Sequence, residues 1–133
     1  MRARATLYLV YTALMRPGDG SAARRGFSAD ERNALMRFVR LHLARQPAPA
    51  DLARELGLGA ERFLRLFKAT YGMAPRRWLL EQRIAESRFR LAHAHEPIGA
   101  IAAALGYADR HLFNRQFKAM VGRTPRAFRA DPR

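Results

Sequence analysis

Cysteine is absent from the 133 residues of the sequence. Its absence excludes disulfide bridges and thiolate metal sites, and it favours the reducing cytoplasm as the place where the protein works. No segment approaches the roughly 20 apolar residues of a membrane-spanning helix, so no membrane partner is expected. The apolar run from Leu7 to Leu14 contains Thr12, is followed by Pro17-Gly18 and lacks a small-residue cleavage site. It therefore predicts a short helix rather than a signal peptide.

Isoleucine and valine are scarce, and no stretch shows sustained alternation of apolar and polar residues. An all-α fold is therefore expected. The first helix of the domain is expected to begin at Ser28, because Ser28 and Glu31 have the spacing of a capping box, in which each side chain accepts a hydrogen bond from a free backbone N–H. Pro47 and Pro49 are expected to stop this helix.

Acidic residues are few: 11 aspartates and glutamates stand against 25 lysines and arginines, for a formal net charge of +14. A small domain with this charge repels itself, so a polyanion is the expected partner. Lysine is rare and 23 of the basic residues are arginine, which suits forked contacts with phosphate or guanine but also follows from GC-rich codon usage. Charge alone does not separate DNA, RNA and anionic lipid.

An internal repeat organises the chain. The segment 52–57 matches the segment 101–106 at an offset of 49 residues, and a longer stretch follows at an offset of 50. In that stretch Phe63, Arg65, Phe67, Lys68, Ala69, Gly72, Pro75 and Arg76 match Phe113, Arg115, Phe117, Lys118, Ala119, Gly122, Pro125 and Arg126.

Each copy is expected to form a short helix, a turn at glycine and a second helix of about a dozen residues, which is a helix-turn-helix unit. The two units are expected at about residues 50–72 and 98–122. The inward residues expected in the first copy are Leu52, Ala53, Leu56, Phe63, Leu66 and Phe67, with Gly57 at positive φ in the turn; in the second copy they are Phe113, Phe117 and Met120.

The outward faces of the second helices follow from a rotation of about 100° per residue. Both helices then direct an arginine and a lysine outward at matching positions. A solvated polar face is the ordinary alternative, but two equivalent basic faces favour the reading of double-stranded DNA. The candidate base-reading residues are Glu61, Leu64, Arg65, Arg110, His111, Leu112, Asn114 and Arg115, and the candidate phosphate contacts are Arg62, Lys68, Arg76, Arg77, Lys118 and Arg126.

Side-chain chemistry suggests what each candidate reads. Arg65, Arg110 and Arg115 can each donate two hydrogen bonds to guanine O6 and N7. Asn114 can pair with adenine, and Leu64 and Leu112 can contact thymine methyl groups. Glu61 either accepts from cytosine N4 or pairs with Arg65 four residues on. The phosphate contacts set the register of the protein on the duplex and the salt dependence of its binding.

A connecting helix is expected over about residues 75–94. Its apolar stripes lie at Leu80, Ile84, Ser87 and Leu91 and at Trp78, Ala85, Phe89 and Ala92, so two sides are expected to be covered. A helix of this length spans roughly 28 Å, close to the ~34 Å turn of B-DNA. One chain is therefore expected to bind as a monomer and to place its second helices in successive major grooves of an asymmetric site.

With these residues in place, the sequence resembles the DNA-binding domain of the AraC/XylS family of transcription regulators, from about Ser28 to Arg129. Arg83-Ile84 in the connecting helix matches the family's Arg-Leu. The second unit resembles the family signature at Ile98, Ile101, Ala102, Leu105, Gly106, Tyr107, Phe113, Phe117, Lys118, Gly122, Thr124, Pro125, Phe128 and Arg129.

The resemblance implies about seven helices in a homeodomain-like arrangement, with two helix-turn-helix subdomains joined by a long linker helix. It also implies promoter binding that recruits RNA polymerase, and it maps the base-reading positions to Glu61, Leu64, Arg65, Arg110, His111, Leu112 and Arg115. A bacterial activator associated with the nucleoid, with no cofactor, is expected.

The family prefers serine where Gly59 and Ala108 stand, at the starts of the reading helices. Glycine is an acceptable N-cap, and Asp109 is expected to replace the cap at Ala108, so that the second reading helix starts one residue later. Residues 28–130 are assigned to the DNA-binding domain, and residues 1–27 form a leader that resembles the tail of an effector domain with its linker. Some family members consist of the DNA-binding domain alone; an effector domain would allow a dimer.

An enzyme, and a non-specific architectural or RNA-binding protein, are the two alternatives to a sequence-specific DNA-binding regulator. No Ser/His/Asp, Cys/His or paired-carboxylate arrangement supports an enzyme, and His93-Ala94-His95 is not expected to hold a metal because the two histidines point to different sides of a helix end. A non-specific architectural protein or an RNA-binding protein is the stronger alternative. RNA modules stack bases on exposed aromatic rings, whereas most aromatic residues here lie at repeated core positions.

Overall fold

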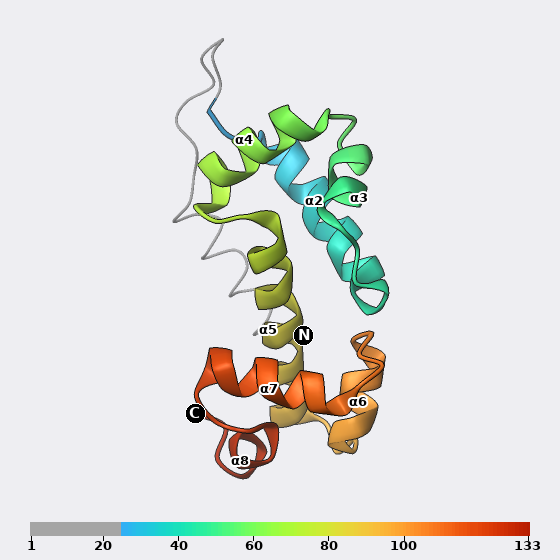
Figure 1. Ribbon diagram of the computed structural model, residues 1–133, viewed down its shortest axis with the longest axis vertical. Coiled ribbons are helices and arrows are strands. Elements are labelled where there is room, and N and C mark those ends of the chain that lie inside the picture. The colour runs from blue at the N-terminus through green and yellow to red at the C-terminus, as the bar shows by residue number, and fades with distance from the viewer. Residues whose placement is uncertain (1–24) are drawn as a thin grey trace. The chain divides into compact units, whose positions relative to one another are not determined.

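A computed structural model describes residues 25–133, and over this range it contains seven α-helices, one 3-10 helix and no strand (Figure 1). The all-α prediction is confirmed for this part of the chain. The short helix predicted between Leu7 and Leu14 lies outside the described residues. No helix within 25–133 is long and apolar enough to cross a membrane.

The helices follow the order α2 (Ala29–His42), η1 (Leu43–Arg45), α3 (Pro49–Glu55), α4 (Ala60–Tyr71), α5 (Pro75–His93), α6 (Ile98–Ala104), α7 (Arg110–Val121) and α8 (Pro125–Ala130). The repeat is visible in the starting residues, since α3 and α6 begin 49 residues apart while α4 and α7, and then α5 and α8, begin 50 apart. The first turn of α5 is thus repeated in α8, which ends after six residues.

The capping box at the start of α2 is confirmed. The Ser28 amide donates to Glu31 Oε1 over 2.9 Å, and the Glu31 amide donates to Ser28 Oγ over 3.1 Å. The end of the helix differs from the prediction: α2 stops at His42, ahead of Pro47, and Pro49 is the first residue of α3. A proline is favourable there because the first helical N–H has no partner to lose.

The helices group into two units, one formed by residues 25–42 with Pro47–Leu79, the other by Leu43–Gln46 with Leu80–Arg133. In the first unit an aromatic cluster fills the core. Phe67 is fully buried and packs edge-on against Trp78 at 5.4 Å between ring centroids, with Tyr71 at 4.7 Å. The other buried residues include Phe27, Leu35, Val39, Leu52, Phe63 and Leu66.

Phe27 is a core residue that the sequence analysis placed in the leader. Its side chain is fully buried, with its ring 5.7 Å from that of Phe63. Its backbone N–H donates to Thr70 Oγ1 over 2.8 Å, and that hydroxyl in turn donates to the Leu66 carbonyl. The core of the first unit therefore includes a residue upstream of the capping box.

In the second unit α7 packs through Phe113 and Phe117, both fully buried, and Phe117 lies edge-on to Phe128 of α8 at 5.6 Å. Arg129 ties α8 to the end of α5, because its guanidinium donates to the carbonyls of Leu91 and Ala94 over 3.3 and 3.2 Å. Such carbonyls at a helix C-terminus have no partner within the helix.

The second apolar stripe predicted on α5 is wrong in part. Ala92 is exposed, whereas Gln82 and Glu86 are buried. Glu86 tolerates burial because Arg90 donates to its carboxylate over 3.0 Å, and a paired charge is far cheaper to bury than a lone one. The first stripe is buried at Ile84, Ser87 and Leu91, as the sequence predicted.

We predict that Phe117→Ala lowers the free energy of unfolding by about 3–5 kcal/mol, because it leaves a ring-sized cavity beneath α7. Chemical denaturation measures this loss. Lys118→Ala, on the exposed side of the same helix, serves as the control and should change stability by less than about 0.5 kcal/mol. A Phe117→Ala protein as stable as the parent would contradict the core placement.

Candidate nucleic-acid interface

The first helix-turn-helix consists of α3, the turn 56–59 and α4. Asp51 organises the start of α3, since its carboxylate accepts a hydrogen bond from the Ala48 N–H over 2.8 Å and another from Arg54 over 2.9 Å. These donors hold the pKa of the Asp51 carboxyl below its usual range. Gly59 caps α4 without a side chain, as predicted.

The exposed side of α4 carries the predicted candidates. Glu61, Arg62, Leu64, Arg65 and Lys68 are all exposed. The inward side is formed by Phe63, Leu66 and Phe67, each exposed by no more than 1%. Leu64 lies among these polar residues and is 49% exposed.

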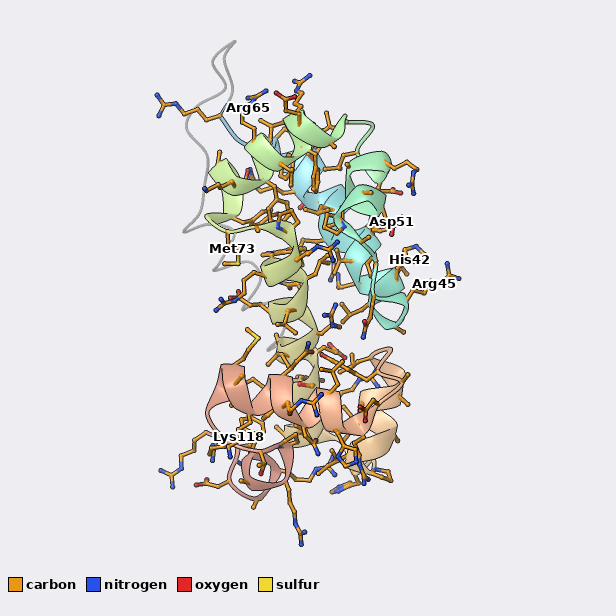
Figure 2. All side chains as sticks on the ribbon, in the orientation of Figure 1. His42, Arg45, Asp51, Arg65, Met73 and Lys118 are labelled. Carbon is orange, nitrogen blue, oxygen red and sulfur yellow. The ribbon has the colours of Figure 1, made fainter. Side chains whose placement is uncertain are left out.

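Glu61 does not form the predicted intrahelical pair. No ion pair or hydrogen bond joins it to Arg65 among the described residues. Of the two roles considered for Glu61, the pairing role is therefore not seen, and Glu61 and Arg65 are both exposed. Arg65 is labelled on α4 in Figure 2.

The second helix-turn-helix consists of α6, the turn 105–109 and α7. Asp109 is the N-cap of α7, and its carboxylate accepts a hydrogen bond from the His111 N–H over 2.9 Å. The helix therefore starts at Arg110, one residue later than the family pattern, as predicted. The exposed side of α7 carries Arg110, His111, Leu112, Arg115 and Lys118.

Asn114 departs from its predicted role. The residue is half-buried, and its amide oxygen is shielded from solvent with no hydrogen-bond partner. A forked pair with adenine needs both the amide oxygen and the amide nitrogen at the surface. In this conformation Asn114 does not present that fork, whereas Leu64, its counterpart in the first unit, is exposed.

All six candidate phosphate contacts are exposed. Four of them occupy two repeated places: the reading helices hold Lys68 and Lys118 at equivalent positions, and the first turns of α5 and α8 hold Arg76 and Arg126. Figure 2 shows Lys118 extending from α7 on the outside of the ribbon. Arg62 and Arg77 complete the set.

Arg123, a basic residue of the second unit, is not among the candidates predicted from the sequence. Arg123 stands just before α8, where the first unit has Met73, so the repeat does not mark this position as basic. Its guanidinium lies over the ring of Phe128 at 5.2 Å and donates to the Asp131 carbonyl over 2.8 Å. Arg123 therefore adds positive charge to the start of α8 in a fixed position.

His93 is the last residue of α5, and His95 follows it two residues later. Among the described residues no group of three histidine, cysteine, aspartate or glutamate side chains could hold a metal ion. His93 instead stacks on Phe89 with ring centroids 4.6 Å apart.

Two units of this geometry, each with an exposed basic second helix, define the class of helix-turn-helix DNA-binding proteins. A family model described as a helix-turn-helix domain matches residues 52–131. The chain belongs to the AraC/XylS family of transcription regulators.

Two curated relatives are named as transcription regulators of the helix-turn-helix type. The HTH-type transcriptional regulator ExsA of Pseudomonas aeruginosa is 31% identical over 91 residues, which are 68% of this chain and 33% of that protein. The HTH-type transcriptional activator RhaS of Pectobacterium atrosepticum is 30% identical over 112 residues, 84% of this chain and 38% of that protein. The chain thus spans about a third of the length of these relatives.

Solved structures share the fold. A transcriptional regulator with an AraC-type DNA-binding domain from Chromobacterium violaceum is similar with a TM-score of 0.69 and 24% identity, covering 78% of this chain and 96% of that one. The DNA-binding domain of the global transcriptional factor AdpA, solved in complex with a target DNA, is similar with a TM-score of 0.70 and 24% identity, covering 77% and 92%.

We predict that Asp109→Ala lowers the free energy of unfolding by about 0.5–2 kcal/mol, because the His111 N–H loses its partner at the start of α7. Asp109→Asn keeps an acceptor at the same place and should cost less. Thermal unfolding of the two variants measures the difference. Equal losses would mean that the carboxylate does not act as the cap.

Proposed function

We propose that this chain binds double-stranded DNA in a sequence-specific manner at promoters and so regulates transcription, with α4 and α7 as its reading helices. The matched basic faces carry this proposal: Arg65 and Lys68 on α4, and Arg115 and Lys118 on α7, all lie opposite buried phenylalanines. An arginine near the middle of an exposed helix suits a fork to guanine, and a lysine three residues later suits phosphate.

The base-reading set that we propose is the exposed one. On α4 it comprises Glu61, Leu64 and Arg65; on α7 it comprises Arg110, His111, Leu112 and Arg115. Glu61 and His111 occupy equivalent positions in the two copies of the repeat. Because these side chains differ, the two helices should prefer different bases. Glu61 would accept from a cytosine amine, whereas an exposed imidazole beside two arginines suits acceptors such as those of guanine.

The connecting helix supports binding as a single chain. α5 has 19 residues, which at a rise of about 1.5 Å per residue give roughly 28 Å. This length is near the ~34 Å that separates successive major-groove sites on one face of DNA. We therefore infer an asymmetric site spanning two successive major grooves and bound by one copy of this domain.

Activation is the inferred direction of regulation, since RhaS bears the name of a transcriptional activator. RNA polymerase is the partner that this role implies, and the cytoplasmic nucleoid is the location. A longer chain with an effector domain would allow dimers. The domain proposed for DNA binding comprises residues 28–130 together with Phe27, which belongs to the core of the first unit.

The main alternative is a non-specific architectural protein or an RNA-binding protein. RNA modules stack unpaired bases on exposed aromatic rings. Within residues 25–133 every phenylalanine, tyrosine and tryptophan is buried or half-buried, so no such stacking surface is presented there. This observation favours duplex DNA over single-stranded RNA.

Selection of duplexes from a random library should return a preferred site that spans about two helical turns. At physiological salt, affinity for this site should exceed affinity for scrambled DNA by at least roughly 10³. A ratio near one would point to the architectural alternative, and tighter binding to single-stranded RNA would point to the other.

We predict that Arg115→Ala costs about 1–3 kcal/mol of binding free energy on the selected duplex and has little effect on scrambled DNA, because it removes a base contact. Lys118→Ala should weaken binding to both and reduce the salt slope by about 1, because it removes a phosphate contact. Arg37→Ala, an exposed arginine of α2, is the control for lost charge. Equal losses for Arg115→Ala on both duplexes would refute its base-reading role.

A further inference from the structure

The second unit includes a short segment that is distant from it in the chain. Leu43–Gln46, which comprises η1 and the next residue, groups with Leu80–Arg133. Leu43 is buried, with 9% of its surface exposed. This 43–46 segment lies against the turn that joins α6 to α7, as two contacts show.

The first contact is a close approach of two backbones at Gly106. A Cβ atom placed on Gly106 would lie 2.2 Å from the Ala44 carbonyl oxygen and 2.9 Å from Gln46 Cγ. Its counterpart Gly57 also has a positive φ, +68° against +89°, but a Cβ there would meet nothing within 4 Å. Gly57 is therefore needed for its backbone conformation alone, whereas Gly106 is also needed because it has no side chain.

The second contact is made by Gln46. Its side-chain Nε2 donates to the Leu105 carbonyl over 3.4 Å. Gln46 has a φ of 50° and is the one non-glycine residue with positive φ in the described part of the chain. Such a conformation costs energy for a residue with a Cβ and persists where the surroundings hold it.

The turn that the 43–46 segment touches also packs against α7. Leu105 and Tyr107, which flank Gly106, are both buried. The Tyr107 ring lies 5.2 Å from that of Phe113, and its hydroxyl donates to Gln116 Oε1 over 2.6 Å. A shift of the backbone at Gly106 would therefore move the neighbouring Tyr107, whose side chain contacts two residues of α7.

We propose that the 43–46 segment is a positioning element for the reading helix α7, with Gln46 and Gly106 as its positioning residues. The segment holds the turn 105–109 at Leu105 and Gly106 and so limits the angle at which α7 leaves the turn. This inference rests on the proposed function, in which α7 reads DNA. It adds to the DNA interface two residues that contact no base.

Hydrogen exchange without DNA tests the contact itself. Gly106→Ala and Gly57→Ala both force alanine into a left-handed conformation, but only the first places a Cβ against the 43–46 segment. We expect the Gln46 amide, which donates to the Leu43 carbonyl over 3.0 Å, to exchange roughly tenfold faster in Gly106→Ala and to stay unchanged in Gly57→Ala. The same exchange rate in both variants would overturn the proposal.

DNA binding tests the positioning role. The probes are the duplex selected with the parent protein and the same duplex scrambled at the bases whose preference is lost in Arg115→Ala. Gln46→Ala, and Gln46→Met, which keeps the length but has no donor, should bind the selected duplex roughly three- to tenfold more weakly. Both should bind the scrambled duplex as tightly as the parent does, at temperatures where circular dichroism shows them fully folded.

The outcomes separate the two proposals. Equal weakening on both duplexes, or no weakening on either, would overturn the positioning role, because a general loss of folded protein does not discriminate between bases. Failure to select any preferred duplex would overturn the proposed function. In that case the exchange measurement still decides whether the 43–46 segment holds the turn.

Discussion

The inward packing of two phenylalanines four residues apart is the constraint on which each reading helix depends. Phe63 and Phe67 lie under α4 with ring centroids 5.5 Å apart, and Phe113 and Phe117 lie under α7 at 5.8 Å. Burying such a pair fixes the rotation of the helix about its axis. Every residue on the opposite face, including the arginine and lysine shared by both copies, is exposed for that reason.

Duplication explains the framework of the two units but not their chemistry. The helices recur at offsets of 49 and 50 residues, and Trp78 and Phe128 occupy equivalent buried positions after the prolines that start α5 and α8. The exposed positions have diverged: where the first copy has Glu61, the second has His111. Substitutions at exposed positions cost little stability, so the two copies can keep one core while presenting different surfaces to a partner.

Several features could be predicted because they depend on neighbours in the chain. The capping box, the late start of α7 at Asp109 and the exposed faces of the reading helices follow from local spacing. Phe27 could not be recognised as core, because its partners lie more than 35 residues away. Glu86 could not be recognised as buried, because charged residues are normally exposed and its burial depends on its ion pair with Arg90.

The pattern of residues was enough to predict the all-α class, the repeat, the N-caps of the reading helices and the family. Helical periodicity and capping act over a few residues, so that neighbours in the chain carry this information. The packing of the helices determines which candidates face solvent, and it shields the amide oxygen of Asn114. It also brought the Ala44 carbonyl to Gly106. Contacts between residues that far apart depend on how whole helices pack, and local spacing carries no record of them.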